Sequence, residues 1–289
     1  MDGIVILNKD SGVFSRSAGW RIAKIFGEKK FGHIGTLDPM ASGVLPIVIG
    51  NATKMIPYIE EFCPNRKEYL FGLKFGFETD SLDITGKIIK NTGKTPNEKD
   101  IKNACEILQN TTDQIPPAFS AIHINGQRAY ELARQGKITD LPARSIKIYE
   151  LKYIGKQDDE YNFRVLCSRG TYVRAIVRDI AKICGTTATT TYIQRTLSNG
   201  FSIKNSVKLD FLENLVNNGD AVKEYLMAPD CALGDIPVIN LGDDDAKLYK
   251  NGGFIKTDEP NGLRRIYCGK IFIGIGRIEN GLIHPKRTL

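Results

Sequence analysis

The stretch Gly32–Pro46 contains the residues of this sequence that point most directly to chemistry. It reads GHIGTLDPMASGVLP and contains one carboxylate, Asp38. Pro39 fixes its own φ and disfavours helical backbone at the preceding residue, and the three glycines allow tight turns and close approach of a ligand. We therefore expect Asp38 to be held stiffly on a loop. An Asp before Pro is often only a turn residue, but a rigid carboxylate can also act as a nucleophile or base.

Four other stretches accompany this loop in a recognisable order. They are Lys67–Tyr69 (KEY), Gln114–Ala121 (QIPPAFSA), Cys167–Arg174 (CSRGTYVR) and Gln194–Thr196 (QRT). Together with Gly32–Pro46, they resemble the TruB family of tRNA pseudouridine-55 synthases. The segment from Phe272–Gly276 through Pro285–Arg287 resembles the small RNA-binding domain of the PUA type that ends members of this family.

The resemblance implies an isomerase that acts on the T-arm of tRNA without a cofactor. Such an enzyme breaks the N-glycosidic bond of a uridine, turns the base and rejoins it through carbon. By the resemblance Asp38 is the catalytic aspartate. A carboxylate suits this role because C1′ must carry positive or covalent character midway, as it does in glycosidases.

The resemblance assigns roles to four more residues. Tyr69 would stack on the target base and take part in proton transfer, although a strand tyrosine commonly packs in a core. Arg174 would pair with Asp38, although a helix arginine is commonly a surface charge. His33 would enter the T-loop to support the flipped-out nucleotide. Ile193 would be an apolar wall beneath the base.

The charge balance favours an acidic partner. Lys and Arg total 40 against 33 Asp and Glu, which gives a formal net charge of +7. A basic balance is typical of nucleic-acid binding, although it also occurs in ordinary soluble proteins. Tyr172 is also expected at the RNA interface, and the candidate phosphate contacts are Lys9, Arg21, Lys24, Arg128, Arg169, Arg195, Lys286 and Arg287.

The first loop departs from the family pattern Asp-Lys-Pro-x-Gly-x-Thr-Ser. Here Asn8–Ser15 reads NKDSGVFS, which keeps Lys9 and Gly12 and lacks the Pro and the Thr. His123 replaces a common lysine, and Gln194 replaces a common arginine. None of these changes affects Asp38, Tyr69 or Arg174.

The surrounding pattern predicts an α+β fold. Apolar runs at Gly3–Leu7, Val44–Ile49 and Glu68–Phe75 and the alternation over Tyr161–Cys167 predict strands. Helical spacing appears over Ser17–Phe26, and Thr171 is expected to cap a helix that ends at Cys184. Asn-Gly pairs at 199–200 and 280–281 predict hairpins, and Thr95–Glu98 predicts a capping box with Pro96 at the first helical position. The expected strands and helices do not alternate in a regular β-α-β order, which favours α+β over a doubly wound parallel sheet.

We therefore expect the pseudouridine synthase catalytic fold, with a mixed, mostly antiparallel sheet and flanking helices. The composition of the sequence changes near Ala228, where Pro, Gly and Asp become frequent and short strands are expected to follow. This change predicts a catalytic domain over 1–228 and a small β-rich, PUA-like RNA-binding domain over 229–289.

Composition and motifs also bear on whether the protein uses a metal or a cofactor and where in the cell it works. The six cysteines form no CxxC pair and the three histidines lie far apart, so we expect no metal site and no disulfide framework. We also expect no nucleotide cofactor, because no Gly-rich phosphate-binding motif is present. No signal peptide or membrane-spanning run is recognisable. A cytoplasmic enzyme, and by the resemblance a monomer, is the expectation.

Three alternatives remain open at the level of sequence. The first is the RNA-guided pseudouridine synthase subunit of a ribonucleoprotein, which has a related signature loop. The second is a non-catalytic RNA-binding or tRNA-folding protein, and folding activity could also coexist with catalysis. The third is a glycosidase or nucleoside hydrolase. That class normally needs a second carboxylate, and Asp80 and Asp83 are expected only in a turn.

Overall fold

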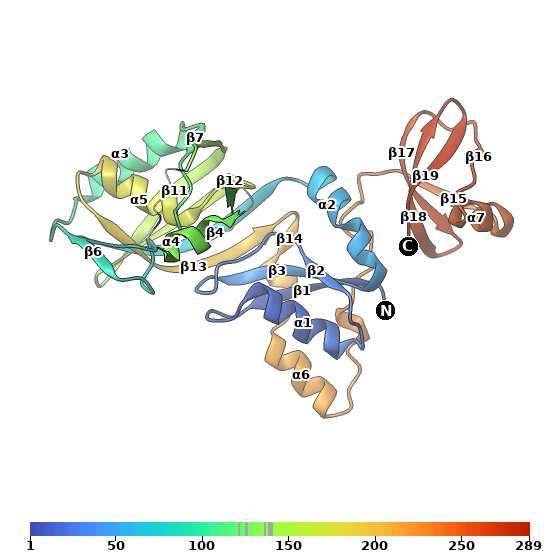
Figure 1. Cartoon of the computed structure of the whole chain (residues 1–289), viewed down its shortest axis with the longest axis horizontal. Helices are drawn as coiled ribbons and strands as arrows, with labels where there is room; N and C mark the ends of the chain where they lie inside the picture. The colour runs from blue at the N-terminus through green and yellow to red at the C-terminus, as the bar shows by residue number, and fades with distance from the viewer. Residues whose placement is uncertain (121, 125–126, 136, 138–140) are drawn as a thin grey trace.

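A computed structural model describes residues 1–120, 122–124, 127–135, 137 and 141–289 of the chain. Two large sheets lie at opposite ends of an elongated molecule (Figure 1). Helices pack against the larger sheet, and the smaller sheet forms a β-rich unit at the C-terminus. The expected α+β class and its small C-terminal β unit are confirmed.

The larger sheet is mixed and mostly antiparallel. Its main strands follow the order β1 (Gly3–Lys9), β3 (Ser42–Ile49), β13 (Ala188–Ser198), β4 (Arg66–Phe75), β12 (Glu160–Ser168) and β11 (Ile148–Gln157). β2 (Phe31–His33) pairs with β3, and β14 (Phe201–Ser202) pairs with β13. Only β3 and β13 are parallel, at Gln194↔Ser42 and Arg195↔Gly43. The sheet therefore consists of two halves that meet at a short parallel junction.

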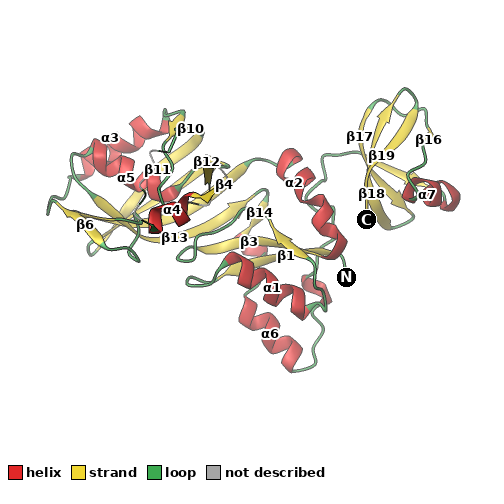
Figure 2. Cartoon of the chain, viewed as in Figure 1, coloured by secondary structure: helices red, strands yellow, loops and turns green. Residues whose placement is uncertain are grey.

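Helices accompany both halves of this sheet (Figure 2). α1 (Ser15–Ile25) and α6 (Leu209–Asn217) lie beside β1 and β3, whereas α3 (Glu98–Gln109) and α5 (Val173–Ile183) lie beside β11, β13 and β4. One buried apolar cluster contains residues of all four helices and of both halves. The other side of β1 and β3 packs against η1 (Gly50–Met55) and α2 (Ile56–Phe62). These layers fix the two halves relative to one another.

Smaller elements border the larger sheet. Asn97 accepts a hydrogen bond from the Asp100 amide, so α3 begins at Glu98 and the expected cap at Thr95 is wrong. The N-cap of α5 is Tyr172, not the expected Thr171, and no side chain caps this helix. The paired short strands are β5 (Phe77–Thr79) with β6 (Ile88–Asn91), β7 (Asp113–Gln114) with β10 (Arg144–Ser145), and β8 (His123–Ile124) with β9 (Gln127–Arg128), which α4 (Ala129–Arg134) follows.

The C-terminal sheet has its own core. Its order is β15 (Val238–Leu241), β17 (Gly262–Cys268), β18 (Ile271–Glu279), β19 (Leu282–Thr288) and β16 (Ile255–Lys256), with α7 (Asp243–Lys250) packed against it. Phe272 and Ile275 also join the apolar cluster beneath β1 and β3. Met227 still pairs with Ile4, whereas Asp230 accepts hydrogen bonds from side chains of β17. The division of the chain after residue 228 stays a prediction.

Candidate active site

A pocket of about 550 Å³ lies where the two halves of the larger sheet meet. Its volume is within the range of small-ligand sites, roughly 300–1,000 Å³. The lining comes from the Asp38 loop, from β4 and β13, from the start of α5 and from β10. It includes Thr36, Asp38, Lys67, Tyr69, Arg144, Thr171, Tyr172 and Ile193. Residues from distant parts of the sequence, between Thr36 and Ile193, thus meet around one cavity.

The Asp38 loop is fastened by the loop that departs from the family pattern. Ser15 Oγ donates to the Leu37 carbonyl at 2.9 Å and accepts from the Leu37 amide at 3.0 Å. The Gly12 amide donates to the Pro39 carbonyl at 2.8 Å. Lys9 Nζ donates to the same carbonyl at 3.3 Å and to the Val13 carbonyl at 2.7 Å. The missing Pro and Thr therefore do not prevent this loop from holding Asp38.

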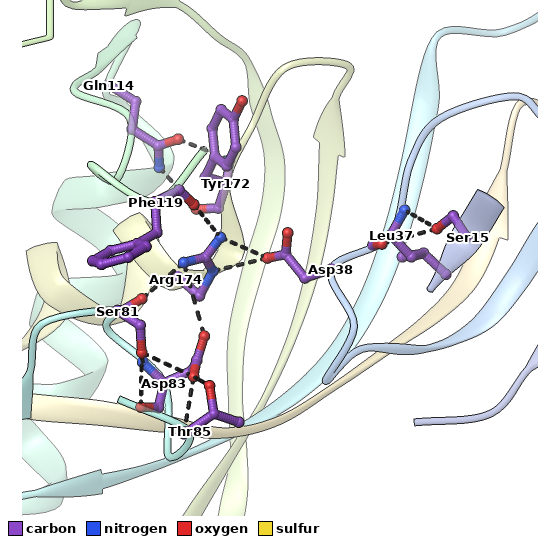
Figure 3. Close-up of polar contacts among 10 residues, drawn as sticks. All are labelled: Ser15, Leu37, Asp38, Ser81, Asp83, Thr85, Gln114, Phe119, Tyr172 and Arg174. Atoms are coloured by element: carbon purple, nitrogen blue, oxygen red, sulfur yellow. Dashed lines mark hydrogen bonds and ion pairs between the residues drawn. The ribbon is translucent and has the colours of Figure 1, made fainter. Parts of the chain in front are cut away.

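Arg174, in the first turn of α5, lies directly against Asp38 (Figure 3). Its Nε donates to Asp38 Oδ2 at 2.8 Å, and its Nη2 lies 2.8 Å from the same oxygen. Its remaining hydrogen bonds go to the carbonyls of Ser81 and Phe119. Arg174 is buried, whereas 38% of the Asp38 side chain is exposed. The buried cation therefore fixes a carboxylate that stays open to the pocket.

The β4 side chains Lys67 and Tyr69 point to the same face of the sheet and line the pocket. Burial raises the pKa of Tyr69 to about 12, against a smaller opposing effect of the Arg195 guanidinium. Burial, reinforced by Arg195, lowers the pKa of Lys67 to about 8. At neutral pH Tyr69 keeps its phenolic proton, and Lys67 is mostly charged.

β13 supplies the floor beside Tyr69. Register shifts between Thr190 and Tyr192 and between Arg195 and Leu197 flank the segment that contains Ile193. Such bulges redirect side chains next to functional sites. Opposite this segment, Gly43 has a φ of +100°, and a Cβ there would lie 2.2 Å from the Arg195 carbonyl oxygen. Only glycine allows β3 to approach β13 so closely.

The structure also shows where His33 and Tyr172, both expected to contact RNA, lie relative to the pocket. His33 ends β2, outside the pocket lining, and its Nε2 lies 2.9 Å from Thr36 Oγ1. Burial, and then Arg195, lowers the pKa of His33. Tyr172 lines the pocket, and Gln114 holds its backbone through two hydrogen bonds.

The expected phosphate contacts are not all on the surface. Lys9 and Arg195 are 1% and 0% exposed, and each donates to backbone carbonyls. They therefore position loops and offer no free surface to a phosphate. Arg21 is ion-paired with Glu213, Arg169 with Glu60, and Lys24 lies over Trp20. The side chain of Arg128 is outside the described residues. Lys286 and Arg287 are exposed on β19.

A basic surface lies beside the pocket, and of its cations only Arg169 was expected from the sequence. Arg66 and Lys147 lie 4.8 Å and 5.3 Å from the ring centroid of Tyr149. Exposed Arg144 lines the pocket itself, and exposed Arg169 immediately follows β12. Cation–aromatic interleaving of this kind is typical of nucleic-acid surfaces. Sequence alone could not find it, because it requires the antiparallel neighbours β4, β11 and β12.

Two further site residues were missed. Asp83, expected as a plain turn residue, is buried with its Oδ2 3.8 Å from Arg174 Nη1. Lys67 was noted only as part of the KEY stretch, and the available signal was that it precedes Tyr69 by two residues on one strand face. Among the described residues, no group of three or more His, Cys, Asp or Glu could hold a metal ion.

Two family models match the chain. Residues 23–173 match the N-terminal domain of the TruB family of pseudouridylate synthases, and residues 237–289 match the C-terminal model of pseudouridine synthase II TruB. The tRNA pseudouridine synthase B of Caulobacter vibrioides is 35% identical over 100% of this chain and 96% of its own length. That of Ehrlichia chaffeensis is 36% identical over 99% of both chains.

Among solved structures, a chain of a Cbf5–Nop10–Gar1 complex aligns with a TM-score of 0.70 at 19% identity. The alignment covers 99% of this chain and 84% of the other. A likeness at this identity shows a shared fold, and it agrees with the expectation of a pseudouridine synthase fold. As for the helices in the described part of the chain, none has the length and apolar character needed to cross a membrane.

Proposed function

The chain belongs to the TruB family of pseudouridylate synthases, and we propose that it converts uridine-55 in the T-loop of tRNA to pseudouridine. The observation that carries this proposal is the buried Arg174 guanidinium holding Asp38 beside a pocket floored by Tyr69 and Ile193. The full-length bacterial relatives bear the name tRNA pseudouridine synthase B. We place the enzyme in the cytoplasm with its substrate and assign it no cofactor or guide RNA.

Asp38 is the nucleophile in this proposal. Its Oδ2 is held by Arg174, while Oδ1 accepts no hydrogen bond from the residues that the structure describes. Oδ1 bonds to C1′ as the C1′–N1 bond breaks and its electron pair leaves on the base. After the ring turns, C5 bonds to C1′ and displaces the carboxylate. C5 then loses its proton and N1 gains one, so the product is an isomer of the substrate.

Tyr69 and Ile193 hold the base during this turn. The flat ring of Tyr69 offers a stacking surface, and the Ile193 side chain offers an apolar wall. Because the pKa of Tyr69 is about 12, its hydroxyl is protonated at neutral pH and can donate a hydrogen bond. We assign Tyr69 and Arg174 to catalysis and Ile193 and Tyr172 to binding of the target nucleotide.

The target uridine has to leave its stack to reach Asp38. An enzyme that modifies a stacked base flips the nucleotide into its pocket. In this proposal His33 fills the gap that the flipped nucleotide leaves, and its hydrogen bond to Thr36, which lines the pocket, supports that role. The exposed cations Arg66, Arg144 and Lys147 would contact phosphates and give binding a strong dependence on salt.

The test uses an unmodified tRNA transcript with purified protein and no added cofactor or guide RNA. Pseudouridine is mapped by nucleotide position for wild type, for Asp38→Asn and for Asp244→Asn, a control whose side chain is fully exposed. We expect conversion at position 55 alone by wild type and by Asp244→Asn, and none by Asp38→Asn.

The same assay separates the alternatives. Conversion by Asp38→Asn would remove the role given to this carboxylate. Binding without conversion by any of the proteins would favour a guide-dependent subunit or an RNA-binding protein. Release of free uracil would identify a hydrolase. If Asp38→Asn still promotes refolding of misfolded tRNA, a folding activity coexists with catalysis.

A further inference from the structure

Lys67 has an unusual position among the cations around the pocket. Its side chain is 9% exposed, yet it lines the cavity that Asp38 and Tyr69 also line. No residue in the described part of the chain accepts a hydrogen bond or forms an ion pair with its Nζ. Nζ is not among the fully buried polar atoms that lack a partner, so it keeps contact with the cavity. A largely buried ammonium without a protein acceptor still loses part of its hydration, which is costly. The cost suggests that an acceptor arrives with a ligand.

The surroundings of Lys67 add positive charge. Arg195 from β13 and Arg169 after β12 both lower its pKa, whereas Cys167 from β12 and Glu60 from α2 raise it. A carbon added at Gly35 would lie 2.7 Å from Lys67 Nζ and 3.2 Å from Arg195 Nη1, so both cations lie against this turn. Arg195 Nη1 is itself buried and makes no hydrogen bond with the described residues. Two cationic groups therefore meet at this turn, and of the two only Lys67 lines the pocket.

The reaction provides an acceptor at this place. When the C1′–N1 bond breaks, the electron pair goes to the uracil ring, and negative charge spreads over N1 and the carbonyl oxygens. The ring is expected over Tyr69, whose neighbour on the same strand face is Lys67. A preorganised cation in a water-poor site stabilises such developing charge far better than water does.

We propose that the Lys67 ammonium donates to a carbonyl oxygen of the target base and stabilises the uracil anion formed when the glycosidic bond breaks. This inference rests on the proposed function. Arg195 is a positioning residue here, because its other nitrogens already donate to Val44 and Gly35. Lys67 lines the pocket next to Tyr69 on the same strand face. This location favours the base over a backbone phosphate as the partner of its ammonium.

The experiment compares Lys67→Met and Lys67→Arg with wild type and with Lys74→Met. Lys74 lies on the opposite face of the same strand and does not line the pocket. Single-turnover rates and the Kd for the tRNA transcript are measured at two salt concentrations. We expect Lys67→Met to lower the rate about 100-fold with its Kd within about twofold, Lys67→Arg to recover part of the rate, and Lys74→Met to match wild type.

Other results would overturn the inference. A weaker Kd with a smaller salt dependence and an unchanged rate would assign Lys67 to a phosphate. A wild-type rate and Kd for Lys67→Met would remove it from the reaction. A lowered melting temperature for Lys67→Met would show that the ammonium is already satisfied within the fold. If wild type makes no pseudouridine at all, the proposed function itself fails.

Discussion

Asp83 Oδ2 lies 3.8 Å from Arg174 Nη1, and both side chains are buried. The other oxygen of Asp83 accepts hydrogen bonds from Ser81 Oγ and from the Thr85 amide. Asp83 is therefore fixed by its own turn and lies near Nη1 of Arg174, whereas Nε and Nη2 of Arg174 face Asp38 (Figure 3). The guanidinium thus has a buried carboxylate beside it in addition to the partly exposed carboxylate of Asp38.

Asp83→Asn should therefore slow the proposed reaction while leaving Asp38, the proposed nucleophile, in place. The amide keeps the shape but loses the charge that orients Arg174, and a small misplacement of a catalytic pair can cost about 100-fold in rate. The rate on a tRNA transcript checks this expectation. Asp80→Asn, in the same turn but exposed, should stay near the wild-type rate. Equal rates for all three proteins would deny Asp83 a positioning role.

Ser15→Ala should loosen the Asp38 loop. The substitution leaves the buried Leu37 amide and carbonyl without their partner, which should cost about 1–3 kcal/mol in the free energy of unfolding. Urea unfolding measures the cost. Ser11→Ala is the control, because Ser11 is exposed and makes one bond to the Met40 carbonyl. A loss no larger for Ser15→Ala than for Ser11→Ala would contradict the assigned role.

Gly43→Ala should damage the junction between β3 and β13. The added carbon would meet the Arg195 backbone and also strain a φ of +100°, so we expect a loss of about 3 kcal/mol or more in stability. Gly219→Ala isolates the strain, because Gly219 has a φ of +78° in open space and should lose only about 1 kcal/mol. Thermal unfolding gives the stability loss of each variant, and the difference between the two losses measures the clash with the Arg195 backbone.

Lys67 should make stability depend on pH in the alkaline range. Burial lowers its pKa in the folded protein to about 8, from an ordinary value of 10.5. Between these values the unfolded chain binds more protons, so the folded state gains stability as pH rises through this window. Below about pH 8, the free energy of unfolding of Lys67→Met should exceed that of wild type by about 3 kcal/mol. Each unit of the pKa difference corresponds to about 1.4 kcal/mol.

This advantage of Lys67→Met should shrink towards pH 10.5. Unfolding free energies of both proteins at pH 7, 9 and 10 provide the check, with Lys74→Met as the matched control. An advantage that does not change with pH would mean that the lysine is not buried as an unpaired charge.

The elements were predictable wherever local chemistry decides the structure. The Asn-Gly pairs at 199–200 and 280–281 do form tight hairpin turns with positive φ at both residues. The apolar faces of α1, α3 and α5 follow helical spacing. Helix starts were less predictable because several residues can cap. Asn97 replaces Thr95 at α3, and Tyr172 replaces Thr171 at α5.

The sequence predicted the stiff loop that contains Asp38, but it did not predict which basic side chains of the site are buried. Pro39 and the glycines indicated a stiff loop around Asp38, and the resemblance paired it with Arg174, which the structure places 2.8 Å away. The burial of Lys9 and Arg195 could not be predicted, because a basic residue in sequence is indistinguishable from a surface charge. The carbonyl partners of Arg195, Val44 and Gly35, are far from it in sequence, and Lys9 adds the distant Pro39 carbonyl to partners in its own loop.

The parallel junction between β3 and β13 has a consequence for how the molecule opens. In the described part of the chain, two residue pairs join β3 to β13, whereas the long antiparallel neighbours β1–β3, β4–β12 and β4–β13 share seven or more. Local openings of a fold separate along its weakest pairing. In a hydrogen–deuterium exchange experiment, the two halves should therefore exchange as distinct cooperative units, and an RNA bound in the pocket should join them into one.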